Sequence, residues 1–253
     1  SDLVRALGGD AQALLRKVGL SARLLQDPEA LIPNNAVREA LELAARATGA
    51  EDFALRLAAR RPLSNLGPVS LVLREAATPR EALDALCRYR KLLNASLITR
   101  IDDEGDCTII RDDLLPIPGL ATRQSMELAL GVMLHILKEL IGSRWRPRRV
   151  CFTHAPPADV AAHRAFFGCS VLFDQPFNGI VCQAADLRQP RSTQDPGMAR
   201  FARDYLESAL QQRGNRASET CRELIQALLP GGRCTSDAVA RHLRMDRRTL
   251  HRH

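Results

Sequence analysis

The chain has 253 residues, of which 45% are hydrophobic and 26% charged, enough for one large domain, or one domain with a smaller second one, around an ordinary apolar core. This composition excludes wholesale disorder, and the sequence has no apolar run near the ~20 residues of a membrane-spanning helix. No charged and then apolar leader opens the chain, so we expect a cytoplasmic protein.

Positive charge is concentrated at the C-terminal end. The formal net charge is +7, and residues 216–253 contain eight arginines against four acidic residues, so this short stretch carries more than half of it. A polyanionic partner is the usual physical reason for such a concentration. A basic tail that serves only solubility is the alternative, and charge alone does not separate the two.

The seven cysteines indicate a reducing compartment. Their number is odd, their spacing is irregular and no Cys-x-x-Cys occurs, so neither a disulfide framework nor a zinc ribbon is predicted. The set closest to a metal site is Cys151, His154, His163 and Cys169. Because Cys151 and His154 are expected on opposite faces of a strand, we predict no metal there, and we expect no cofactor.

The first sixty residues are predicted to form short helices, and a further helix is predicted to begin at Thr78. Apolar residues recur at helical spacing over 37–45, and Gly49 follows where a C-terminal cap is expected. A short helix is expected from Phe53 to about Arg61. The run Thr78-Pro79-Arg80-Glu81 is typical of a helix start, because a threonine can cap the amide three residues on and a proline fits the first turn.

Strands enter after this helix. Residues 97–102 and 107–111 predict a hairpin that turns at Glu104-Gly105, and the acidic groups at 102–104 and 112–113 that flank it are expected to be solvated. The remaining elements are expected in the order helix 126–141 ended by Gly142, strand 150–153, helix 158–167, and strands 171–173 and 179–182. Residues 1–190 therefore predict a helix-rich α+β domain with a small, mostly antiparallel sheet.

Residues 191–215 are expected to connect this domain to a second one. They contain an amphipathic helix, 198–210, and a polar linker, 211–215. The apolar residues of the helix are Met198, Phe201, Ala202, Tyr205, Leu206 and Leu210.

Residues 216–253 predict an all-α, helix-turn-helix module. A short helix ends near Leu243, a tight turn follows, and Asp246 is a good N-cap for a last helix in which Leu250 points inward. A recognition helix needs long hydrogen-bond donors near its N-terminus on the outer face, where arginine can reach guanine or phosphate. The candidate DNA-contacting residues are Arg247, Arg248, Thr249, His251 and Arg252.

The run 238–252 resembles the first helix-turn-helix of AraC/XylS-type transcription regulators. Upstream pieces resemble the arabinose-binding-like N-terminal domain of one branch of that family: 66–73, the helix 78–93 with Arg88-Tyr89-Arg90, 145–150 and 167–173. Two residues depart from the family turn, namely Arg244 in place of glycine and Asp246 in place of serine. Since the family has a second helix-turn-helix and this sequence ends at His253, the resemblance implies a chain truncated within the first one.

The resemblance implies an effector-responsive regulator. In its full-length form it would bind double-stranded DNA and act as a homodimer. A small molecule bound to residues 1–190 would alter the placement of its helix-turn-helix modules. The effector-binding residues are unknown, with His135, Tyr89 and Arg90 as weak candidates; a core role for His135 is the favoured alternative.

The competing interpretation is a stand-alone small-molecule sensor or an enzyme with an incidental basic C-terminal helix. The sequence contains no phosphate-binding glycine loop and no Gly-x-Ser-x-Gly nucleophile elbow, so we name no catalytic residue and predict no enzyme.

Overall fold

The structure is a computed structural model that describes residues 2–21, 32–115, 117, 119–192, 195, 197–212 and 235. It divides into two compact units, 1–199 and 200–253. The predicted helix-turn-helix, 216–253, falls outside the described residues except at position 235.

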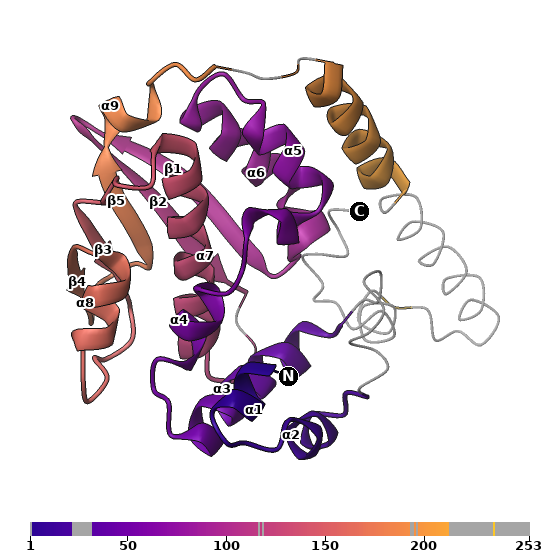
Figure 1. The fold of residues 1–253 in the computed structure, drawn as a ribbon, viewed down its shortest axis with the longest axis vertical. Coiled ribbons are helices and arrows are strands. Elements are labelled where there is room, and N and C mark those ends of the chain that lie inside the picture. Colours follow the sequence, from indigo (N-terminus) through magenta and orange to yellow (C-terminus); the bar gives the residue numbers. More distant parts are fainter. Residues whose placement is uncertain are drawn as a thin grey trace. The chain divides into compact units, whose positions relative to one another are not determined.

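The first unit is built mostly from helices (Figure 1). They are α1 Asp2–Ala6, α2 Ala11–Lys17, α3 Asn34–Thr48, α4 Phe53–Ala58, the 3-10 helix η1 Leu63–Leu66, α5 Pro68–Arg74, α6 Pro79–Leu93, α7 Arg123–Ile141, α8 Ala161–Phe167 and α9 Ala184–Leu187. The predicted helix ends hold: Gly49 and Gly168 cap α3 and α8 in the left-handed conformation, and the Thr78 hydroxyl accepts from the Glu81 N–H of α6.

Strands of the described residues form one sheet in the order β1-β2-β5-β3-β4. They are β1 Leu97–Glu104, β2 Cys107–Leu114, β3 Arg149–Cys151, β4 Ser170–Leu172 and β5 Gly179–Gln183. Most neighbours are antiparallel, but β3 and β4 are parallel, because α8 carries the chain back between them. The predicted α+β class is confirmed, with this one parallel pair.

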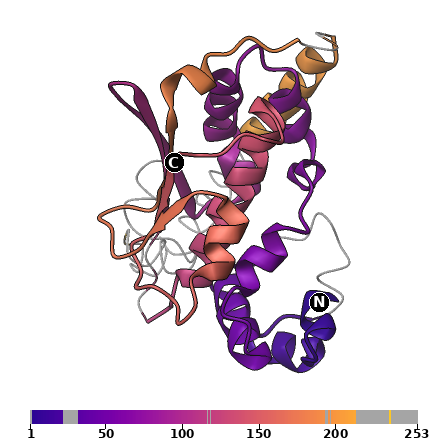
Figure 2. The same ribbon diagram turned by 60° about the vertical axis from the view of Figure 1, so that its left-hand side comes forward.

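Helices α6 and α7 pack side by side on one face of the sheet, as both views show (Figures 1 and 2). The core between them and the strands includes Leu130, Leu134, Ile110 and Ile180, all inaccessible to solvent. Behind α7, helix α4 approaches closely, since a Cβ added at Gly131 would lie only 2.7 Å from the Cβ of Ala58.

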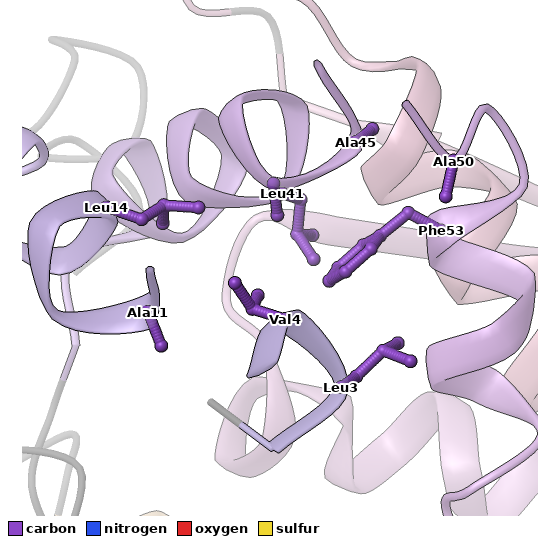
Figure 3. Close-up of a cluster of buried hydrophobic side chains, with 9 residues drawn as sticks. Leu3, Val4, Ala11, Leu14, Leu41, Ala45, Ala50 and Phe53 are labelled. Atoms are coloured by element: carbon purple, nitrogen blue, oxygen red, sulfur yellow. The ribbon is translucent and has the colours of Figure 1, made fainter. Parts of the chain in front are cut away.

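A second apolar cluster joins α1, α2, α3 and the start of α4 (Figure 3). Its buried members are Leu3, Val4, Ala11, Leu14, Leu41, Ala44, Ala45, Ala50 and Phe53. The cluster buries one side of α3, the side of Leu41, Ala44 and Ala45. The side that carries Asn35, Glu39 and Arg46 is exposed to solvent.

The helix predicted at 198–210 forms over 197–212, but its buried side differs from the expected one. Ala199, Ala202 and Leu206 are buried, whereas Phe201 and Tyr205 are exposed. The buried stripe therefore follows the aliphatic residues rather than the aromatic ones.

Candidate functional site

A groove of about 390 Å³ lies between α3 and the segment that leads into α7. The α3 wall consists of Asn35, Glu39, Glu42 and Arg46, at the spacing of one helix stripe. The opposite wall consists of Ile117, Gly119, Leu120 and Ala121. One wall is thus polar and charged and the other mainly apolar, and the volume is within the range of small-molecule sites.

Two hydrogen bonds hold the groove walls together. The Arg38 Nη1 of α3 donates to the carbonyl of Leu115, at 2.8 Å. The Glu42 carboxylate accepts from the main-chain N–H of Gln124, at 2.9 Å, and so caps the first turn of α7, where Thr122 gives no side-chain cap. Both ends of the segment between Leu115 and Gln124 are therefore anchored to the same helix.

Arg38 is an unusual residue for the inner side of a helix. Its side chain is only 2% exposed, and among the described residues its Nη2 atom has no hydrogen-bond partner. Burial alone holds the pKa of this guanidinium below its ordinary value. A cationic group thus lies near the groove, and within the described part of the chain its hydrogen-bond partner is a main-chain carbonyl.

A buried carboxylate, Glu127 of α7, forms the centre of a second polar cluster. Its Oε1 atom lies 2.9 Å from the Arg123 Nε, 3.0 Å from the His163 Nε2 and 3.5 Å from the His154 Nε2. The rings of Phe152 and Phe173 lie against both histidines. Burial lowers the pKa of His154, which favours its neutral form.

The Glu127 cluster is suited to fastening elements together rather than to holding a metal. The Arg123 guanidinium pairs with Glu127 Oε1, and its positive charge would repel a second cation at this carboxylate. Within the described ranges, no group of three or more His, Cys, Asp or Glu side chains is arranged for a metal ion. The cluster connects α7 with α8 and with the chain that follows β3.

Hydrogen bonds also connect the groove with the Glu127 cluster. Gln124 Nε2 and Arg123 both donate to the carbonyl of Glu51, and the Glu51 carboxylate accepts from the N–H of Ala158. The amide oxygen of Gln124 accepts from the N–H of Ala54. The first turn of α7 therefore links the groove, the start of α4 and the buried carboxylate in one polar network.

Asp112 of β2 corrects an expectation from the sequence. This residue was expected to be solvated beside the hairpin, but its side chain is inaccessible, with Oδ1 accepting from the Thr99 hydroxyl at 2.6 Å. Burial is the main cause that raises its pKa to about 6. The alternation along β2 explains the difference, because it turns Asp112 toward the same side as the core residue Ile110.

The weak effector candidates lie on the helices that cover the sheet. His135 of α7 stacks on Phe166, with ring centroids 5.6 Å apart, and Tyr89 of α6 is 3% exposed. Arg90 is partly buried on the same helix. None of the three is among the described residues that line the groove. The candidate DNA-contacting residues, 247–252, lie outside the described residues, so their role stays a prediction.

Sequence reasoning missed the two residues on which the polar architecture depends. Glu127 carried a usable signal, since Arg123 and Glu127 are four residues apart on a strongly predicted helix. Arg38 carried none, because nothing in its sequence context marks an arginine that is buried with no acidic partner in the part of the chain that the structure describes.

Comparison with known proteins agrees with this architecture. Residues 8–191 match the family described as the arabinose-binding domain of AraC transcription regulators, N-terminal. The chain is 31% identical over 254 residues to the HTH-type transcriptional regulator VirS of Mycobacterium tuberculosis, in both strain CDC 1551 / Oshkosh and strain H37Rv, a match that covers all of this chain and 75% of the relative.

A solved structure shares the fold. The crystal structure of the transcriptional regulator CdpR from Pseudomonas aeruginosa superposes with a TM-score of 0.60 at 20% identity, covering 91% of this chain and 76% of that one.

A helix-rich α+β domain with these relatives defines an effector-responsive transcription regulator. The chain belongs to the AraC family of transcription regulators, in the branch with the arabinose-binding-type N-terminal domain. The matched relatives are regulators, and no helix in the described ranges is both long and apolar enough to cross a membrane.

Proposed function

We propose that a small molecule bound to residues 1–190 changes how the DNA-binding module at 216–253 is placed on double-stranded DNA. The observation that carries this proposal is the groove on α3, a small-molecule-sized hollow beside a buried cation within the segment that matches the family. An effector acts only through different affinities for two arrangements of the protein. The segment 191–215 would transmit the change, because it connects the two domains.

The proposed DNA contacts are made by Arg247, Arg248, Thr249, His251 and Arg252. Arginines near the start of a recognition helix pair with guanine edges or hold phosphates, and the surplus of positive charge after residue 216 attracts the polyanion from a distance. The protein would work in the cytoplasm, where DNA is accessible, and without catalysis.

A homodimer is part of the proposal. Phe201 and Tyr205 are 68% and 55% exposed on the connecting helix, and exposed aromatic side chains are frequent at protein–protein contacts. Sedimentation of the chain and of a Phe201→Ser/Tyr205→Ser variant tests this point: the wild type should sediment as a dimer and the variant as a monomer. A monomeric wild type would contradict it.

The regulatory proposal is tested by DNA affinity. Duplexes are selected from a random library with the full-length regulator, and fluorescence anisotropy then gives Kd with and without the fraction of a host-cell extract below 1 kDa. We expect at least a fivefold change in Kd, the lower end of ordinary coupling between two sites. The change should disappear after dialysis. An affinity that no dialysable component alters would contradict regulation by a small molecule.

A further inference from the structure

We propose that a basic surface of the first unit, around the turn between α7 and β3, binds the phosphate backbone of double-stranded DNA. This inference rests on the proposed DNA-binding function, and it adds a second, sequence-independent contact besides the helix-turn-helix. The surface, called the turn patch, consists of Lys138, Arg144, Arg146, Arg149 and Arg164.

The net positive charge that precedes residue 216 is confined to one segment. From residue 138 to residue 164 the chain has six basic residues and two acidic ones. Residues 1–137 have 17 basic and 18 acidic residues, and residues 165–215 have five of each. Four of the six basic residues are the arginines of the run 144–149. Such a local excess of one sign of charge is typical of a surface that meets a polyanion.

Most arginines of this run have no acidic partner in the part of the chain that the structure describes. Arg148 pairs with Asp106, with 2.7 Å between the guanidinium and the carboxylate. Arg144, Arg146 and Arg149 are exposed and make no salt bridge with a described residue. Three positive charges within six residues are therefore available to an external anion.

The turn that carries these arginines is anchored to the sheet side of the domain. The indole N–H of Trp145 donates to the Asp186 carboxylate at 2.8 Å, and Pro147 is buried. The main-chain N–H of Arg148 donates to the carbonyl of Val181 at 2.9 Å. Side chains on an anchored turn lose less conformational freedom on binding, so more of their interaction energy contributes to affinity.

Arg146 connects the turn with α7 and α8. Its side chain lies across Gly168, since a Cβ added at this glycine would lie 2.6 Å from the Arg146 Nε, and Gly168 follows Arg164 by one helical turn. In the last turn of α7, burial and the positive charge of Arg146 lower the pKa of Lys138. Two cations from different elements thus repel each other here, and a phosphate between them would relieve that repulsion.

Double-stranded DNA is the polyanion that these observations favour. Five of the six basic residues in 138–164 are arginines, whose planar guanidinium groups match phosphate oxygens in pairs. A duplex presents phosphates at close, regular intervals, so it can compensate several separated cations at once. The proposed helix-turn-helix belongs to the same chain, which raises the effective concentration of a bound duplex for the first unit. An acidic protein surface is the alternative partner, and DNA affinity would then not depend on the patch.

Anisotropy titrations of the full-length regulator test the proposal with the variant Arg144→Gln/Arg149→Gln. They are carried out between 50 and 200 mM salt on a selected duplex and on a scrambled duplex of equal length. Kd should rise at least about tenfold on both duplexes, because phosphate contacts do not depend on sequence. The slope of log Kd against log salt concentration should fall by about two, since each lost phosphate contact removes about one.

Two controls separate the contact from net charge and from folding. Arg16→Gln/Arg60→Gln removes two exposed arginines outside the patch and should change Kd by less than about twofold. Arg144→Lys/Arg149→Lys retains both charges and should keep Kd within about threefold of the wild type.

The outcomes distinguish this inference from the proposed function. If the Gln variant binds both duplexes with the wild-type Kd and slope, the patch does not contact DNA, and this inference alone is overturned. A loss confined to the selected duplex, or a Lys variant as weak as the Gln variant, overturns it as well. A wild-type regulator that binds neither duplex would overturn this inference together with the proposed DNA-binding function.

Discussion

The Nε2 of His163 lies 3.0 Å from the Oε1 of Glu127, and neither side chain is accessible to solvent. The Arg123 guanidinium, whose side chain is 27% exposed, pairs with the same carboxylate oxygen. A charge inside the domain is thus compensated by one cation at its edge, and two imidazole rings lie beside it. Such a cluster contributes little stability over an apolar core, but removing one member is strongly destabilising.

Removal of the buried carboxylate should therefore destabilise the protein. Glu127→Ala leaves Arg123 and two histidines without their common partner, and we expect a loss of about 3–5 kcal/mol in the free energy of unfolding, measured by urea denaturation. Glu139→Ala is the matched control, because Glu139 also lies on α7 and pairs with Arg74, but both side chains are nearly half exposed. Its loss should stay below about 1 kcal/mol. Equal effects of the two substitutions would contradict the account of the cluster.

Glu42 should stabilise the start of α7. Glu42→Ala leaves the Gln124 N–H without its acceptor, and the expected loss is about 1 kcal/mol, the typical contribution of a helix cap. Glu42→Gln keeps an acceptor oxygen and should recover most of it. The control is Glu39→Ala on the same stripe, which should change stability by less than about 0.5 kcal/mol. If Glu42→Gln is as unstable as Glu42→Ala, the hydrogen bond to the Gln124 N–H is not the cause of the stability loss.

Asp112 should make stability depend on pH. Burial raises its pKa in the folded protein from 3.8 to about 6, so the folded state holds the proton more tightly than the unfolded state does. Its stabilising contribution is complete below pH 4 and is lost as the pH rises through 6. The loss reaches about 3 kcal/mol.

The measurement is the difference in unfolding free energy between the wild type and Asp112→Asn, across pH 4 to 7. Asn keeps an acceptor for the Thr99 hydroxyl but does not titrate. Relative to the wild type, the unfolding free energy of the variant should rise by about 2.4 kcal/mol between pH 4 and pH 7. If the unfolding free energies of the wild type and of Asp112→Asn differ by the same amount at every pH from 4 to 7, Asp112 titrates normally, and the prediction is contradicted.

The fold could be predicted from the sequence wherever the signal is local. Gly49, Gly168 and the Thr78 cap mark helix ends by short-range chemistry, and the β1–β2 hairpin follows from its turn. The parallel pairing of β3 with β4 could not be predicted, because strands of three residues are too short for periodicity to specify their partners.

The candidate site was less accessible to prediction for a related reason. Burial of Asp112 and of Arg38 depends on which elements cover them, and the sequence does not specify that. Charge at such positions contradicts the usual rule that ionised side chains are exposed. The burial of a charged residue such as Asp112 or Arg38 can therefore be recognised only when the fold is known.

The claim on which the whole account depends is that residues 247–252 read DNA. Anisotropy titrations of the full-length regulator on a selected duplex, between 50 and 200 mM salt, should give an Arg247→Ala/Arg252→Ala variant a Kd at least about tenfold above that of the wild type, with a shallower salt dependence. Arg60→Ala removes one positive charge elsewhere and should have little effect. If the double variant binds with the same Kd and the same salt dependence as the wild type, those arginines do not contact DNA, and the account is contradicted.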